Sequence, residues 1–396
     1  MTSIKIDPKY KSSIGIIVVG YNRYFSLKRL LESLKKAQYP SPSIPLVISI
    51  DCSGDEKVYD LARTYEWPFG DKYVIIQKER LGLKQHILKC GDLSQYFKAI
   101  ILLEDDVYVS EFFYDYTQKA VEYYYEEQRV GGISLYQDEV VGQFPAVYLN
   151  NGSSTYLKQN PSSWGECWTD KQWRGFREWL DGFTSQSFDR IDMPLHMKKW
   201  DRAWSIYFLA YLIETKRYVV YPYISLTTCF GDAGEHSTST SAVGQVCMLS
   251  NECDFHFRPY NEMVKYDIYG VNEDIYTWLN IPKNELCVDW YGLNPNISKC
   301  RYILTPIKIK MQPIKSFGLT MRPIELNIKN DIKGDGLFLY DIAEGNYCAK
   351  RKKLPVSMAQ YYLRYFDNDL IIKYMFDMFK KRLVNKLRLF AIRHRK

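Results

Sequence analysis

The sequence of 396 residues lacks the short motifs that mark several common enzyme classes. It contains no G-x-x-x-x-G-K-[ST], G-x-G-x-x-G, G-x-S-x-G or H-E-x-x-H. These absences count against P-loop, dinucleotide-binding, hydrolase-elbow and zincin chemistry. No internal repeat stands out, so nothing indicates a repeat architecture.

Long apolar runs and patterned cysteines are also missing. No run reaches the length of a transmembrane helix, and the first ten residues contain no signal-peptide core. The nine cysteines are scattered singly, without a C-x-x-C pair. An odd, unpatterned set argues against a disulfide framework or a structural zinc site. We therefore expect a protein of the reducing cytosol.

Excess charge is confined to the C-terminus. Residues 380–396 hold eight Lys or Arg and no acid, and removing these eight cations from the net charge of +7 leaves −1. From about Leu370, apolar residues recur at helical spacing between the cations. This pattern fits a helix packed on the body with a solvated basic face, or an interfacial helix lying on anionic lipid. We favour the anionic membrane surface and expect no nucleic-acid partner.

Short apolar runs alternate with helical periodicity over the first 110 residues. The runs are Ile14–Val19, Leu46–Ile50, Tyr73–Ile76 and Ile100–Leu103. Helical patterns follow at 25–38, near 58–65, near 85–93 and at 111–128. This alternation predicts βαβ units, and hence an α/β fold with a mostly parallel sheet flanked by helices.

The rest of the chain predicts further strands and a change of character. Val130–Leu135 and Val219–Ser225 are expected strands, and 140–163 is expected to be a loop. The expected divisions are an α/β catalytic domain at 13–250, a small β-rich appendage of unknown role at 251–350, and a basic amphipathic helical tail at 355–396.

Three consecutive acids follow the fourth apolar run. Glu104, Asp105 and Asp106 stand at the end of a strand that is predicted to be buried on both faces. Like charges this close repel, so some must be protonated or neutralised by a cation. Mn²⁺ or Mg²⁺, held by one or two carboxylates and by substrate phosphates, would meet this need. The simpler alternative is a solvated acidic turn.

Other polar residues follow the neighbouring strands. Asn22 and Arg23 come after the first strand, and Asp51 comes after the second. Ligands of parallel sheets bind beyond the carboxyl ends of the strands, so these residues and the acidic triplet are expected to share one binding site. The Gly-, Ser- and Thr-rich run Phe230–Thr240, which contains His236, predicts a mobile loop whose amides could meet phosphate.

Together these motifs resemble those of GT-A fold glycosyltransferases, in particular the N-acetylglucosaminyltransferase I family, whose metal motif is also Glu-Asp-Asp. The resemblance spans roughly residues 13–240. The matching segments are Asn22-Arg23, Val47–Glu56, Leu103–Asp106, Trp164-Gly165, Trp200-Asp201, and Ile224–Gly231 with Gly234–His236 beyond.

The resemblance implies an inverting transfer of a sugar from a nucleotide sugar, a UDP-sugar such as UDP-GlcNAc, to a glycan or lipid-linked acceptor. Asp106 would be the direct ligand of Mn²⁺ or Mg²⁺, and Glu104 and Asp105 would contact the ribose or the donor sugar. Asp51 would hydrogen-bond the uracil, and Arg23, beside Asn22, would meet the nucleotide or diphosphate.

The resemblance also implies roles for two histidines and for a general base. His86 stands near the position of a family histidine at the donor site, and the loop containing His236 would close over the diphosphate. Asp201 would be the base that deprotonates the acceptor hydroxyl. From the residues alone, Asp201 could instead be the N-cap of the helix predicted at Ala203–Leu212. Glu166 and Asp170 are the alternative bases.

The chain departs from the animal enzymes of that family in lacking a membrane anchor and a disulfide-permissive context. We expect it in the cytoplasm, peripheral on the inner face of the cell membrane, in surface polysaccharide synthesis. One alternative is a sugar nucleotidyltransferase, which would carry a Gly-rich, Lys/Arg-containing triphosphate loop where this chain has Gly20–Tyr24. The other is a non-catalytic glycan-binding module, which would leave the acidic triplet unexplained.

Overall fold

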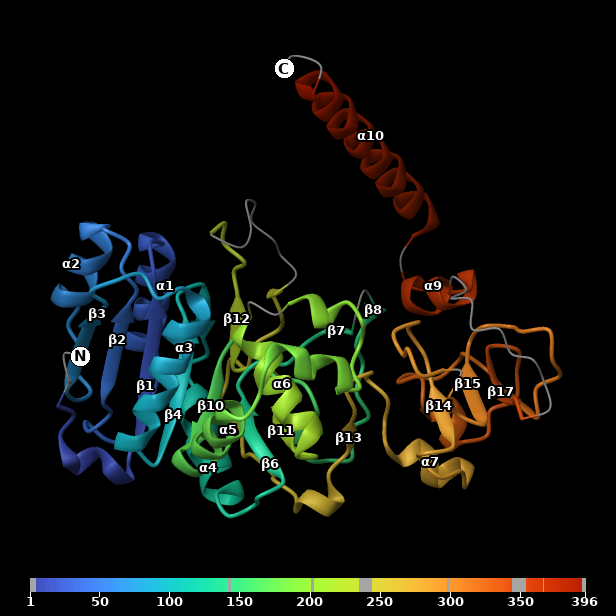
Figure 1. Cartoon of the computed structure of the whole chain (residues 1–396), viewed down its shortest axis with the longest axis horizontal. Helices are drawn as coiled ribbons and strands as arrows, with labels where there is room; N and C mark the ends of the chain where they lie inside the picture. The colour runs from blue at the N-terminus through green and yellow to red at the C-terminus, as the bar shows by residue number, and fades with distance from the viewer. Residues whose placement is uncertain are drawn as a thin grey trace.

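The computed structural model describes residues 5–141, 144–200, 203–234, 244–297, 299–343, 354–365 and 367–393. A nine-stranded sheet, in the order β13-β9-β11-β6-β10-β4-β1-β2-β3, runs from one end of the body, at β3, to its middle, at β13 (Figure 1). The strands are β1 (Ile14–Gly20), β2 (Leu46–Ile50), β3 (Lys72–Ile76), β4 (Ala99–Glu104), β6 (Val130–Ser134), β9 (Thr155–Lys158), β10 (Glu166–Thr169), β11 (Tyr218–Pro222) and β13 (Lys265–Tyr266).

The first half of this sheet confirms the α/β prediction. Strands β3, β2, β1 and β4 are parallel neighbours, and every residue of β1 and β2 is buried. Helices α1 (Tyr24–Lys36), α2 (Glu56–Thr64) and α3 (Leu83–Gly91) connect them. Because all four strands run the same way, the residues that follow each strand meet at one edge of the sheet.

An antiparallel strand interrupts the parallel order. β10 lies between β4 and β6, with Glu166 opposite Leu102 and Thr169 opposite Ala99. The predicted loop at 140–163 is wrong in part, since it contains β9 and the antiparallel pair β7 (Val140–Val141) and β8 (Phe144–Pro145). These strands have only two to four residues, too few to show a period among the Gly and Asn residues around them.

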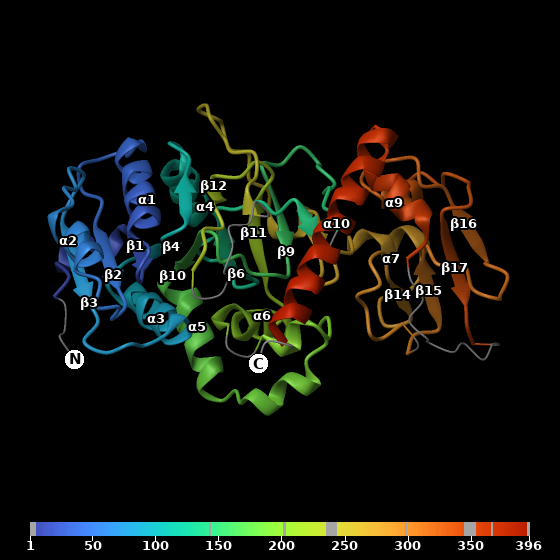
Figure 2. The ribbon, with the colours of Figure 1, turned by 90° about the horizontal axis from the view of Figure 1, so that it is seen from above.

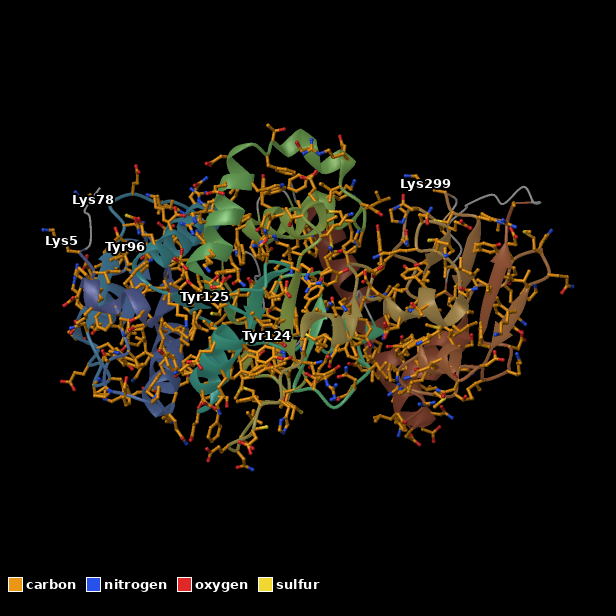
Figure 3. The ribbon with its side chains drawn as sticks, turned by 90° about the horizontal axis from the view of Figure 1, so that it is seen from below. Lys5, Lys78, Tyr96, Tyr124, Tyr125 and Lys299 are labelled. Carbon is orange, nitrogen blue, oxygen red and sulfur yellow. The ribbon has the colours of Figure 1, made fainter. Side chains whose placement is uncertain are left out.

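Helices α4 (Phe113–Tyr124), α5 (Asp170–Asp181) and α6 (Trp204–Glu214) also belong with this sheet. We call the nine-stranded sheet and helices α1 to α6 the main domain. Figure 3 shows Tyr124 and Tyr125 at the end of α4, near the middle of the molecule. The Tyr124 hydroxyl donates to the Arg258 carbonyl oxygen at 3.0 Å. A segment that follows residue 250 is thereby tied to the main domain.

The β-rich region near the C-terminus is confirmed as a separate four-stranded sheet (Figure 2). It contains β14 (Leu286–Val288), β15 (Tyr302–Thr305), β16 (Lys315–Phe317) and β17 (Leu337–Asp341), with α7 (Asp274–Leu279) and α8 (Leu326–Lys329) nearby. Its Leu304 and Leu339 belong to the same hydrophobic cluster as Trp168 of the main domain. The main sheet itself extends past residue 250, because β13 pairs with β9.

The chain ends in α9 (Val356–Leu363) and α10 (Asn368–Arg393). In Figure 1, α10 projects from the body of the protein beyond α9. Residues 370–384 are exposed apart from the half-buried Ile371 and Met378, so this part of the helix does not pack on the body. In the described residues, no helix is both long and apolar enough to cross a membrane.

Candidate active site

A cleft of about 440 Å³ opens at the carboxyl edge of the parallel strands. Its lining includes seven residues predicted from the sequence: Asn22, Arg23, Asp51, His86, Glu104, Asp105 and Asp106. They come from the ends of β1, β2 and β4 and from α3. Of the other two predicted site residues, Asp201 and His236 both lie outside the described residues.

The acidic triplet spans the end of β4 and the turn before β5 (Val107–Val109). Burial raises the pKa of Glu104 to about 8, and the charges of Asp106 and Asp105 add to the rise. Its Oε1 is shielded from solvent and has no hydrogen-bond partner. Burial also raises the pKa of Asp105 to about 6, against the opposing effect of Arg23. Glu104 is therefore mostly protonated at neutral pH in the free protein.

Arg23 bridges the other two acids from the N-cap position of α1. Its Nη1 lies 3.0 Å from Oδ2 of Asp106, and its Nη2 is paired with Oδ1 of Asp105. Burial opposes the charge on the guanidinium, but the two carboxylates outweigh it and raise the pKa of Arg23. The cation that the triplet requires is thus supplied in part by the chain itself.

The segment after β12 (Thr227–Cys229) closes one side of the cleft. Its Asp232 accepts hydrogen bonds from Ser26 Oγ at 2.7 Å and from Arg29, both on α1. These bonds lower the pKa of Asp232, although burial opposes them. The Asp232 carbonyl oxygen also accepts a hydrogen bond from Arg23 Nη1 at 3.3 Å. The start of the predicted phosphate loop is therefore anchored to α1 and to Arg23.

Asp51 organises the opposite side of the cleft. Its carboxylate accepts the backbone N–H groups of Cys52, Leu81 and Gly82, each at 2.9 Å. Gly82 has a φ of +73°, which glycine adopts readily, and it is the N-cap of α3. Asp51 thus joins the end of β2 to the start of α3. Its predicted hydrogen bond to the uracil of the nucleotide remains a prediction.

His86 lies one turn into α3 and is 2% exposed. Its Nε2 is 2.7 Å from the Ser49 hydroxyl of β2. Burial lowers the pKa of His86 to about 4, although the charge of Asp51 opposes this. The imidazole is therefore neutral near pH 7 and can act as both a hydrogen-bond donor and an acceptor.

The Trp-rich segments meet the acidic triplet. The side chain of Trp204, which is 2% exposed, lies close enough to Glu104 to oppose the rise of its pKa. α6 begins at Trp204 with Ala203 at the N-cap. The N-cap alternative for Asp201 is therefore wrong, because the cap position falls two residues later in the sequence.

The two alternative bases are not supported. Glu166 is 2% exposed and does not line the cleft, and burial raises its pKa. Asp170 lies at the wrong edge of the sheet, because its N–H donates to the carbonyl oxygen of Lys98, just before β4 begins. Strand β10 runs antiparallel to β4 and carries Asp170 away from the cleft.

Sequence reasoning missed several lining residues, among them Tyr21, Arg80, Trp164 and Asp232. The Arg80 guanidinium lies 5.0 Å from the centre of the Tyr21 ring. Its position after β3 was an available signal, since that strand also ends at the carboxyl edge. Trp164 lies within a segment that the resemblance covers, but no pattern in the sequence indicates a role for it.

The carboxylate oxygens of the acidic triplet suit a hard divalent cation, because such oxygens are its preferred ligands. In the part of the chain that the structure describes, no three His, Cys, Asp or Glu side chains form a complete metal site. Asp106 is the more accessible Asp of the triplet, with 13% of its side chain exposed against 5% for Asp105. A metal held there would need phosphate oxygens and water to complete its coordination.

No model of a known protein family matches the sequence, and no curated protein is similar to it at a significant level. One similar solved structure is the mannosyltransferase PcManGT from Pyrobaculum calidifontis in complex with GDP-Man and Mn²⁺, with 18% identity and a TM-score of 0.32 over 46% of this chain and 50% of that chain. Another is residues 1–349 of S. aureus TarS in complex with UDP-GlcNAc, with 14% identity and a TM-score of 0.37 over 56% of this chain and 60% of that chain.

This chain thus covers only about half to three-fifths of those two structures. TM-scores below 0.5 are too low to assign a substrate, a cofactor or a mechanism to this protein.

Proposed function

We propose that this protein is an inverting, metal-dependent glycosyltransferase with a GT-A fold. It transfers a sugar from a UDP-sugar, such as UDP-GlcNAc, to a glycan or lipid-linked acceptor. The observation that supports this is the cleft, where an acidic triplet and the polar residues after β1 and β2 share one lining. A glycan-binding module has no need of such a set, and the chain offers no glycine-rich triphosphate loop after β1.

Each lining residue has a role that suits its state in the free protein. The metal, Mn²⁺ or Mg²⁺ held by Asp106, supplies positive charge to the leaving diphosphate when it is bound. Protonated Glu104 can donate a hydrogen bond to a sugar or ribose hydroxyl, and Asp105 can accept one. Asp51 and neutral His86 would lie beside the uracil of the bound nucleotide.

Asp201 is assigned as the general base. The acceptor oxygen attacks the anomeric carbon of the donor, the acceptor proton passes to the Asp201 carboxylate, and the bond between sugar and diphosphate breaks. The nucleoside diphosphate leaves with the electron pair, and the configuration at the anomeric carbon inverts. The position of Trp204 beside Glu104 supports this assignment, since Trp204 follows Asp201 by three residues.

We further propose that α10 attaches the enzyme to the anionic inner face of the cell membrane, where a lipid-linked acceptor would be found. Large apolar side chains are exposed along this helix, with Met375, Phe376 and Phe379 each more than 60% exposed. Lys380, Lys381 and Arg382 follow directly. Apolar area and adjacent cations are the two features that bind a helix to anionic lipid.

The test is a nucleotide-release assay across a panel of nucleotide sugars, with and without Mn²⁺. We expect UDP release that EDTA abolishes. Asp106→Asn should slow release at least about 100-fold, which is typical when a charge-stabilising group is lost, with the melting temperature nearly unchanged. Asp60→Asn, on the exposed side of α2, is the matched control and should match wild type.

Two results would contradict the proposal. Release of pyrophosphate from a nucleoside triphosphate and a sugar phosphate would identify a nucleotidyltransferase. Full activity of Asp106→Asn would remove Asp106 from the metal site.

A further inference from the structure

Arg23 already pairs with one carboxylate oxygen of Asp106, the proposed metal ligand. Its Nη1 is 3.0 Å from Asp106 Oδ2, and both side chains are partly exposed to solvent, at 21% for Arg23 and 13% for Asp106. A divalent ion binds carboxylate oxygen at about 2.0–2.6 Å. A metal on this oxygen would therefore stand beside the guanidinium, and two cations that share one carboxylate repel each other.

We propose that Arg23 is the resident counter-cation of the acidic triplet, and that it releases Asp106 only when a nucleoside diphosphate provides it with a new partner. The inference rests on the proposed function, since it takes Asp106 as the metal ligand. A guanidinium binds phosphate oxygens as well as it binds carboxylates. The diphosphate thus removes Arg23 from Asp106 and supplies oxygen ligands to the metal at the same time.

One consequence is a coupling between two ligands. In the free protein the metal must displace Arg23 without compensation, so it binds weakly. With diphosphate present, the same displacement gains a new ion pair. Metal and diphosphate therefore bind cooperatively, by more than their direct contact alone would produce.

A second consequence concerns the segment after β12. Arg23 donates to the Asp232 carbonyl oxygen, while the Asp232 carboxylate is held by Ser26 and Arg29. A Cβ on Gly234 would lie 3.4 Å from Arg23 Cδ, so this segment packs directly against the arginine. When Arg23 turns to the diphosphate, this tie is released and those from α1 remain. The same movement therefore lets the segment adjust to the bound nucleotide.

The experiment measures Mn²⁺ binding directly, from the electron paramagnetic resonance signal of free Mn²⁺, without and with saturating UDP. We expect Arg23→Gln to bind Mn²⁺ alone about tenfold more tightly than wild type, because no guanidinium competes for Asp106. UDP should then tighten Mn²⁺ binding by a factor about tenfold smaller in Arg23→Gln than in wild type. The control Lys28→Gln removes an exposed cation from the same helix and should match wild type.

The outcomes separate this inference from the proposed function. If Mn²⁺ binds in the presence of UDP but Arg23→Gln changes neither its affinity nor the coupling, the inference is wrong and the metal site stands. If neither wild type nor the two variants bind Mn²⁺ even in the presence of UDP, the proposed metal-dependent function is wrong. Should Arg23→Gln not fold, Arg23→Lys is used, whose ammonium group cannot bridge both acids, and an affinity for Mn²⁺ equal to that of wild type would overturn the inference.

Discussion

Replacement of Asp51 by Asn tests whether this carboxylate builds the nucleotide side of the cleft. Asp51 Oδ1 accepts the N–H groups of Cys52 and Leu81, and Oδ2 accepts that of Gly82, all at 2.9 Å. An amide has one oxygen, so Asn can serve Oδ1's partners but must turn its NH₂ group towards the Gly82 N–H. Two donors would then face each other in a place that is 3% exposed.

The expected cost follows from this geometry. A lost hydrogen bond to a charged acceptor is worth about 1.5–3 kcal/mol, and water cannot replace it at a buried position. We expect Asp51→Asn to lower the free energy of unfolding by that amount. Gly82 and Leu83 line the cleft, so the affinity for UDP should also fall. Each 1.4 kcal/mol of binding free energy spent on returning these two residues to their places lowers the affinity about tenfold.

Urea unfolding and calorimetric titration with UDP measure the two effects. The matched control is Asp55→Asn, because Asp55 caps α2 by accepting one N–H, from Lys57, at 3.0 Å, and Asn caps a helix about as well as Asp. The control should leave both quantities unchanged. If Asp51→Asn weakens UDP binding with no loss of stability, the hydrogen bonds to residues 81 and 82 do not stabilise the fold. Asp51 would then act only through its contact with the uracil.

Three further predictions address the remaining parts of the proposal. Asp201→Asn should lower kcat by about 10²–10⁴-fold, as is typical when a general base is lost, without changing donor affinity or melting temperature; normal turnover would exclude Asp201 as the base. Burial lowers the pKa of His86 to about 4 from its ordinary 6.5, so the unfolded chain takes up the proton first as the pH falls. The free energy of unfolding should therefore fall by about 3 kcal/mol as the pH drops from 6.5 to 4. In urea unfolding, His86→Gln should lack this dependence on pH. An equal dependence in the variant would show that His86 does not cause it. Deleting residues 366–396 should abolish co-sedimentation with anionic liposomes at low salt, where each nearby Lys or Arg contributes about 1 kcal/mol, while transfer to a soluble acceptor continues; if the full-length protein does not bind such liposomes, α10 is not a membrane anchor.

The sequence predicted the parallel half of the sheet because its strands are continuous apolar runs. β1, β2 and β4 are buried on both faces and need no alternation to be recognised. β10 gave no such signal, since it has four residues and one of them is Glu166. Its antiparallel direction could not be read from composition, and that direction is why Asp170 was wrongly considered near the site.

The candidate site was predictable where a rule of topology applies and not where a tertiary contact decides. Asn22, Arg23, Asp51 and the triplet were found because parallel strands end at one edge, and the same rule would have found Arg80 after β3. No local pattern indicates that Trp204 lies beside Glu104, from which it is one hundred positions away in the sequence. The protonation of Glu104 likewise follows from burial that only the folded chain creates.

The repulsion among three adjacent acids can be relieved by a proton or by a cation, and the free protein uses both. Glu104 keeps a proton because its pKa is raised to about 8, and Arg23 neutralises Asp105 and Asp106. Repulsion in the free protein therefore does not by itself require a metal. What favours a metal is the partial exposure of Asp106 to a cleft that would receive a diphosphate. We propose that the need for a divalent ion arises when a diphosphate brings in further negative charge and draws Arg23 towards itself, so that the nucleotide forms part of the metal site.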